Sequence, residues 1–103
     1  MSVVVVAIIS PLDGHIQNVV DAFAIVSPKV HVEPGNELYA LTRDADTVVM
    51  IERWTSPADL AAHAAGAAMN ELNALLAGHV TGAPAVRVLE NVPLGDPAKG
   101  SIQ

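Results

Sequence analysis

The sequence predicts one α+β domain with the element order β-α-β-β-α-β, which is the ferredoxin-like arrangement with an antiparallel sheet. Four segments have the β-branched or alternating composition of strands: residues 3–9, 37–43, 47–54 and 85–92. Two segments repeat apolar residues at helical spacing: residues 16–24 and 57–77. No repeat or linker divides residues 1–92, so we expect a single domain there. Residues 93–103 are rich in glycine, proline and small side chains, and we expect a C-terminal tail that frays or reaches a partner.

The first strand and the first helix are predicted near the N-terminus. Val3–Ile9 is β-branched and does not alternate with polar residues, which is typical of a strand buried on both faces. Asp13 is a candidate N-cap for the helix that follows. The apolar positions of that helix are Ile16, Val19, Val20, Phe23 and Ala24. Pro28 lacks a backbone N–H and restricts the residue before it, so we expect the helix to kink or restart there.

A β-hairpin is predicted in the middle of the chain. Residues 37–43 and 47–54 both alternate, and Asp44-Ala45-Asp46 between them has the composition of a tight turn. In the second of these strands, one face carries Val48, Met50, Glu52 and Trp54. The other face carries Val49, Ile51 and Arg53. The two strands should therefore pair antiparallel.

A capped helix is predicted after the hairpin, at residues 57–65. Ser56 is a good N-cap, and Asp59 completes a short-armed version of the capping box. The apolar stripe of this helix carries Leu60 and His63, which are three residues apart and so lie on one face.

The helical pattern is interrupted by Gly66 and resumes at residues 67–77. Gly78 has the place of a C′ residue, and residues 85–92 form the last predicted strand. The apolar face of the resumed helix carries Met69, Leu72, Leu75 and Leu76.

A candidate site follows if the stripe of residues 57–65 packs on the face that carries Trp54. Met50, Glu52, Trp54 and His63 then share the space between strand and helix. We interpret His63 as a base or proton relay and Glu52 as the carboxylate that orients its imidazole. Tyr39, one strand over, is a candidate hydroxyl donor to a substrate oxygen. The alternative is a structural role for each: Trp54 as an aromatic plug, and the others as hydrogen-bonded or edge residues.

The composition excludes several classes of function. The net charge is −6 and no cluster of Lys or Arg occurs, so nucleic acid and an anionic membrane are not expected as partners. Without cysteine there is no disulfide, thiolate nucleophile or Cys-based metal centre. No glycine-rich nucleotide-binding motif and no metal-binding pattern is found. Val3–Ile9 is too short to span a bilayer and has no flanking signal features, so we expect a cytoplasmic protein.

The apolar strands also predict a homodimer. In the ferredoxin-like arrangement both helical segments cover one face of the sheet, yet the strand at Val3–Ile9 is apolar on both faces. The uncovered apolar face needs a partner, and a second copy of the same sheet is the simplest one.

Two stretches of the sequence resemble a known family. VHVEPGNELYAL (residues 30–41) and VVMIERWTSPADLAAH (residues 48–63) contain an ordered set of E-P-G, Y-A-L, V-M-I-E-x-W and A-A-H steps. This set is similar to the antibiotic biosynthesis monooxygenase domain family, closest to its small quinol-monooxygenase-like members. The likeness runs over residues 3–92. It implies a dimeric α/β barrel formed by two ferredoxin-like protomers.

The resemblance implies an oxygenase that uses neither metal nor flavin. In such members a phenol, quinol or polyketide-like substrate loses a proton, and its anion passes electrons directly to O₂. By position, Trp54 matches the pocket tryptophan. With Trp54, the residues Met50, Leu60 and Met69 are the predicted substrate-binding residues. Met50 stands where the polyketide oxidases have a hydrogen-bonding asparagine. His63 matches the first of two histidines in quinol-oxidising relatives, and Ala68 stands in the place of the second.

Other branches of the family fit the sequence less well. Haem-degrading members have an asparagine, a tryptophan and a ligating histidine at the positions of Ala7, His63 and Leu72, so haem is not expected. An isomerase of a small sugar-like molecule would need a more polar pocket. The main alternative to a monooxygenase is a non-catalytic, stress-related or small-molecule-binding dimer that keeps the fold and pocket but lacks the polar groups for turnover.

Overall fold

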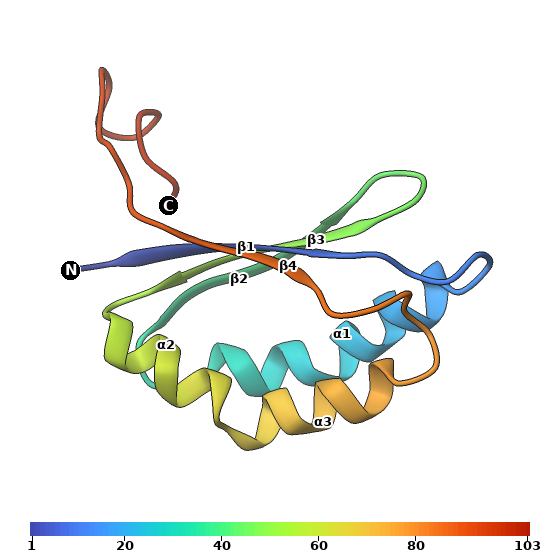
Figure 1. Ribbon diagram of the computed structural model, residues 1–103. Coiled ribbons are helices and arrows are strands. Elements are labelled where there is room, and N and C mark those ends of the chain that lie inside the picture. The colour runs from blue at the N-terminus through green and yellow to red at the C-terminus, as the bar shows by residue number, and fades with distance from the viewer.

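The computed structural model describes residues 1–103 and has four strands and three helices (Figure 1). The strands are β1 (Val3–Ile9), β2 (Asn36–Arg43), β3 (Val48–Trp54) and β4 (Ala85–Leu89). The helices are α1 (Ile16–His31), α2 (Pro57–Ala64) and α3 (Ala67–Leu76). The strands form one antiparallel sheet in the order β2-β3-β1-β4. This confirms the predicted ferredoxin-like α+β fold, with the second helical segment divided at Gly66.

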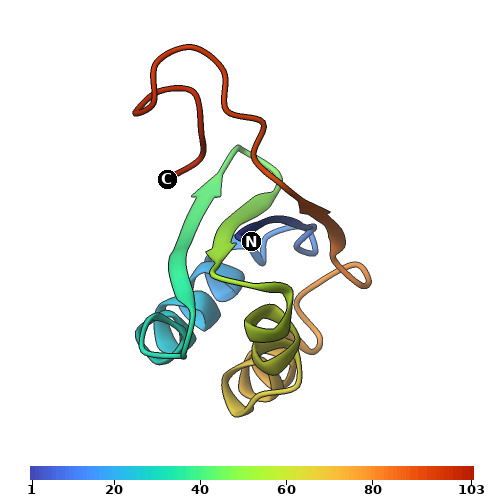
Figure 2. The same ribbon diagram turned by 90° about the vertical axis from the view of Figure 1, so that its left-hand side faces the viewer.

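All three helices lie on one side of the sheet, the N-terminus lies at the end of β1 level with the sheet, and the C-terminal tail lies on the side opposite the helices (Figures 1 and 2). The alternation in β3 is confirmed: Val48, Met50, Glu52 and Trp54 are buried, whereas the residues between them are half-buried. Together with Val5, Ala7 and Ile9 of β1, the apolar members of this set pack into the core with the helices. No helix is long and apolar enough to cross a membrane.

The opposite face of the sheet is also apolar and carries no helix. We call it the open face, and its large apolar residues on the two central strands are Val4, Val6, Ile8, Val49 and Ile51. Ile8 is 39 % exposed, although it lies in a central strand. The open face is therefore apolar and not covered by a helix, as the prediction of a second copy assumed.

The structure bears on two expectations for α1, and the expected Asp13 cap is wrong. The helix begins at Ile16 with His15 in the N-cap position, and no side chain caps it. Asp13 lies outside the cap because Gly14, with φ of +79°, turns the chain between Asp13 and the helix. The helix also continues through Pro28 to His31 without restarting. Pro28 is on the exposed side, so the carbonyl that loses its usual partner, that of Ala24, can hydrogen-bond to water.

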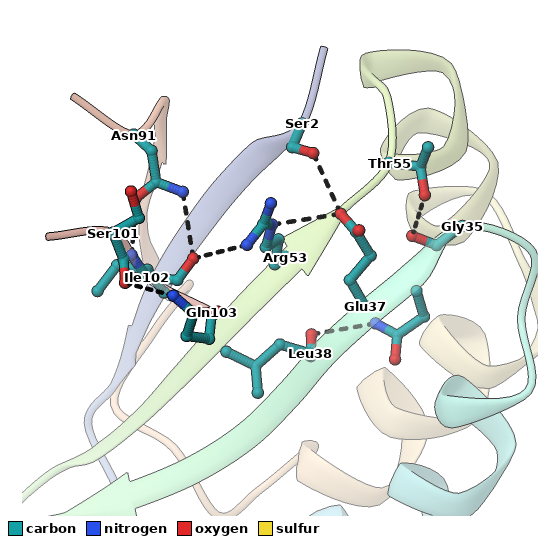
Figure 3. Close-up of polar contacts among 11 residues, drawn as sticks. Ser2, Gly35, Glu37, Leu38, Arg53, Thr55, Asn91, Ser101, Ile102 and Gln103 are labelled. Atoms are coloured by element: carbon teal, nitrogen blue, oxygen red, sulfur yellow. Dashed lines mark hydrogen bonds and ion pairs between the residues drawn. The ribbon is translucent and has the colours of Figure 1, made fainter. Parts of the chain in front are cut away.

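The last strand is shorter than predicted, because β4 ends at Leu89 rather than at residue 92. It is an edge strand that pairs only with β1, and all five of its residues are exposed. The tail then turns back toward the open face (Figure 3). The Ile102 carbonyl accepts hydrogen bonds from Arg53 Nη1 at 2.8 Å and from Asn91 Nδ2 at 3.2 Å. In this single chain the tail thus contacts its own sheet.

Candidate functional site

A cavity of about 220 Å³ lies between the sheet and helices α2 and α3. Twelve of its sixteen lining residues are hydrophobic, and no Lys or Arg lines it. Six of the seven site residues predicted from the sequence line it: Tyr39, Met50, Glu52, Leu60, His63 and Met69. The seventh, Trp54, does not. The sheet and the helix stripe therefore bring the predicted groups together around an apolar chamber with a polar end.

His63 is placed at this polar end by the cap of α2. The Ser56 hydroxyl accepts a hydrogen bond from the Asp59 N–H at 3.2 Å and fixes where the helix begins. His63, two turns on, faces the sheet and is only 4 % exposed. Its Nδ1 lies 2.6 Å from Glu33 Oε1. A carboxylate accepts and does not donate, so in the neutral imidazole Nδ1 carries the hydrogen and Nε2 keeps a free lone pair.

The free nitrogen is buried without a hydrogen-bond partner. His63 Nε2 makes no hydrogen bond, and the nearest carboxylate oxygen, Glu52 Oε1, is 3.9 Å away. A buried polar atom left unpaired costs stability, so native proteins rarely keep one without a role. His63 is also one of the residues that line the cavity, so its imidazole adjoins whatever the cavity holds.

Glu33 belongs to this site, and the sequence patterns did not indicate it. The sequence predicts Glu52 as the group that orients His63 and assigns no role to Glu33. In the structure Glu33 is the carboxylate that contacts His63 Nδ1. The E-P-G turn explains how. Gly35 has φ of +80°, its carbonyl accepts a hydrogen bond from the Thr55 N–H at 2.9 Å, and the Asp59 side chain fills the space where a Cβ would be. The turn is thus held against the start of α2.

Glu52 and Trp54 form a second buried pair beside His63. The indole Nε1 donates a hydrogen bond to Glu52 Oε1 at 2.9 Å, and both residues are almost fully buried. Burial raises the pKa of Glu52, and the Trp54 N–H and His63 partly oppose this, while the charge of Glu33 adds to it. The indole ring stacks on the imidazole with 4.5 Å between ring centroids and 30° between planes. Trp54 therefore lies behind His63 and not in the cavity wall.

Tyr39 lies directly opposite Glu52 in the β2–β3 ladder. Its ring meets that of His63 edge-on, with centroids 5.9 Å apart. Burial, followed by the negative charges of Glu52 and Glu33, raises the pKa of the Tyr39 hydroxyl well above its usual value of 10.0. At neutral pH the hydroxyl is therefore a hydrogen-bond donor and not a base.

No group of three or more His, Cys, Asp or Glu side chains is arranged to hold a metal ion. The chemistry of the site is thus that of one imidazole, two carboxyls and one phenol in an apolar enclosure. Such a set can accept a proton from a buried ligand and can donate hydrogen bonds to its oxygen atoms.

The same fold occurs in solved structures. Rv0793 from Mycobacterium tuberculosis is 23 % identical, with a TM-score of 0.81 over 93 % of this chain and 98 % of that one. A putative antibiotic biosynthesis monooxygenase from Caulobacter crescentus CB15 is 24 % identical, with a TM-score of 0.81 over 88 % and 90 %. A conserved protein from Methanosarcina mazei Go1 is 16 % identical, with a TM-score of 0.79 over 85 % and 90 %.

Among proteins with curated descriptions, none matches the sequence. The sequence profile of the family described as antibiotic biosynthesis monooxygenase matches residues 2–75, which include Glu33, Tyr39, Glu52, Trp54 and His63. The chain belongs to the antibiotic biosynthesis monooxygenase family.

Proposed function

We propose that this protein is a cofactor-independent monooxygenase that oxidises a small phenolic or quinol substrate with O₂. The observation that carries the proposal is the state of His63, a residue that lines the apolar cavity: its Nδ1 is held by Glu33 at 2.6 Å, and its Nε2 is buried and has no hydrogen-bond partner. A base oriented by a carboxylate in a water-poor site suits the removal of a proton from a substrate hydroxyl.

The reaction needs no reductant other than the substrate. His63 Nε2 takes the hydroxyl proton, and the resulting anion gives one electron to O₂. The radical pair combines at a ring carbon that bears hydrogen, and the protonated His63 returns its proton to the peroxide. Loss of the C–H proton and of hydroxide then forms water and a new carbonyl. One oxygen atom enters the product, the other leaves as water, and all four electrons come from the substrate.

The remaining residues have supporting roles in this scheme. Met50, Leu60 and Met69 hold the ring by apolar contact. The Tyr39 hydroxyl donates a hydrogen bond to the substrate oxygen as negative charge develops on it. The Glu33 carboxylate stabilises the imidazolium that forms, and the indole face of Trp54, 4.5 Å away, does the same from behind.

We propose a homodimer as the working form. Sequestering the open face against a second copy would remove exposed apolar surface such as Ile8 from water. A face-to-face pairing through β1 and β3 is consistent with the apolar character of these two central strands on that side.

The test is oxygen uptake by purified protein against a panel of hydroquinones and anthrone-type phenols, without added metal or flavin. His63→Ala should reduce uptake to the rate of autoxidation. His79→Ala, which removes a histidine outside the cavity, should retain the wild-type rate. Uptake that is equal in wild type and His63→Ala would refute the proposal.

A second candidate is a non-catalytic binding protein. It is favoured by Met50, a thioether that lines the cavity where the oxidising relatives place an amide. Panel compounds that bind and raise the Tm while no oxygen is consumed would select this alternative.

A further inference from the structure

The cavity at His63 continues into a second hollow. A cleft of about 250 Å³ lies beneath the loop that joins α3 to β4, and it shares four lining residues with the cavity: Ile9, Asn73, Leu76 and Pro84. Binding sites for small molecules usually measure about 300–1,000 Å³. The cavity alone is smaller than that, whereas cavity and cleft as one site fall within the range. The cleft is therefore placed to receive a part of the ligand that the cavity cannot hold.

The lining of the cleft is almost entirely apolar. Its one polar side chain is Asn73, at the junction with the cavity; Val80 and Ala83 of the loop contribute apolar surface. No charged residue lines the cleft, and neither hollow contains a Lys or Arg that could pair with an anion. The nearest carboxyl groups are those beside His63, namely Glu52 in the cavity lining and Glu33 at His63 Nδ1. A carboxylate on a substituent that enters the cleft would lose part of its hydration without a Lys or Arg to pair with it.

We propose that the cleft beneath the α3–β4 loop is a subsite for an uncharged, apolar substituent of the substrate, carried on the ring that lies at His63. The identity of the ring rests on the proposed function, whereas the preference for an apolar, uncharged substituent rests on the two linings. The substituent passes Asn73, which marks the boundary between the ring subsite and the substituent subsite.

The experiment is anaerobic titration calorimetry with methylhydroquinone, ethylhydroquinone, n-butylhydroquinone and 2,5-dihydroxyphenylacetate. Each fully buried methylene is worth about a fourfold gain in affinity, because about 0.8 kcal/mol per CH₂ corresponds to that ratio. The butyl compound should therefore bind at least about tenfold more tightly than the methyl compound. The carboxylate should bind at least about tenfold more weakly than the ethyl compound of similar size.

Two variants locate the subsite. Ala83 is exposed and lies in the cleft lining, so Ala83→Trp can fill the cleft without disturbing the core. It should remove the butyl preference while leaving methylhydroquinone affinity within about twofold. Ala74→Trp, on the exposed side of α3 and outside both linings, should retain the preference.

The possible results are distinguishable. Equal affinity for methyl and butyl compounds, or a full butyl preference in Ala83→Trp, would overturn the subsite. Equal affinity for the carboxylate and the ethyl compound would overturn the requirement for an uncharged substituent. Because these measurements exclude O₂, the predicted binding pattern without oxygen uptake in air would uphold the subsite and refute only the oxygenase reaction.

Discussion

The hydrogen bond between Trp54 and Glu52 should stabilise the fold in a pH-dependent way. Its two partners are 0 % and 5 % exposed, and the donor and acceptor are 2.9 Å apart. A hydrogen bond to an ionised group contributes about 1.5–3 kcal/mol, and one between neutral groups about 1 kcal/mol. Trp54→Phe keeps a ring against His63 but removes the donor, so it should leave the Glu52 carboxylate buried with one partner fewer.

The charge-dependent part of this effect can be isolated with a double-mutant cycle. Glu52→Gln keeps an acceptor for the indole N–H and removes the ionisable group. The change in packing from Trp to Phe is common to both backgrounds and cancels. We therefore expect the loss of this hydrogen bond in Trp54→Phe to lower the free energy of unfolding by about 2 kcal/mol when Glu52 is ionised. In the Glu52→Gln background the loss should be about 1 kcal/mol, so the coupling energy is about 1 kcal/mol. For a domain of this size, a coupling energy of about 1 kcal/mol corresponds to a shift of about 4–8 °C in Tm.

The direction of the pH dependence follows from the raised pKa of Glu52. A carboxyl whose pKa is higher in the folded than in the unfolded state favours folding below its unfolded pKa, and this advantage is lost as the pH rises through the folded value. Wild type should therefore lose stability relative to Glu52→Gln as the pH rises above 4.5. The Trp54 N–H lowers the pKa of Glu52, so in Trp54→Phe the loss should be larger.

The assay is urea unfolding of the four proteins at one protomer concentration, from pH 4 to pH 8.5. The coupling should be near zero at pH 4, where Glu52 is protonated, and should grow toward pH 8.5. A coupling below about 0.3 kcal/mol at every pH, within the error of such cycles, would refute the reasoning.

Three further predictions concern activity and assembly. Glu33→Gln keeps an acceptor for His63 but removes the charge that stabilises the imidazolium, so kcat should fall by about tenfold to a hundredfold with KM little changed; steady-state oxygen uptake measures both. Tyr39→Phe should lower kcat/KM by about tenfold without lowering the Tm, because no protein group hydrogen-bonds the Tyr39 hydroxyl in the structure; a fall in Tm would contradict this. Ile51→Asp places a charge on the open face and should give a protomer-sized mass by light scattering, whereas Ala61→Asp on the exposed side of α2 should not; a dimeric Ile51→Asp would refute the face-to-face pairing.

Much of the fold could be predicted because it is encoded by local patterns. The period-two alternation in β3 placed Met50, Glu52 and Trp54 on one face, and the structure buries all three. The cap at Ser56 set the phase of α2, so His63 was expected to face the same space. Pattern and capping fix side-chain direction over a few residues, and here two such local predictions converged on one site.

The contacts that could not be predicted depend on geometry between distant segments. Glu33 and His63 are thirty residues apart, and they meet because the turn at Gly35 is hydrogen-bonded to Thr55 and packed against Asp59. The E-P-G step was a signal for this turn, but composition alone does not show which helix the turn touches. The placement of Trp54 behind His63 rather than in the cavity wall has the same origin, because alternation shows which face of the strand a residue lies on and not whether it reaches the cavity.

The two proposed functions of the site, proton acceptance and binding of a substituent, come from different parts of the chain, and the family match covers only the first part. The polar groups around His63 lie on the α1–β2 turn, the β2–β3 hairpin and α2, all within the matched residues 2–75. The cleft proposed to receive the substituent is lined largely by the end of α3 and the loop after it, including Val80, Ala83 and Pro84, which lie outside that match. Substitutions in this loop can therefore change which ligand binds without touching the proton-accepting centre. Membership of the family consequently says more about the proposed reaction than about the substrate. Differences in substrate between members should be sought in the α3–β4 loop.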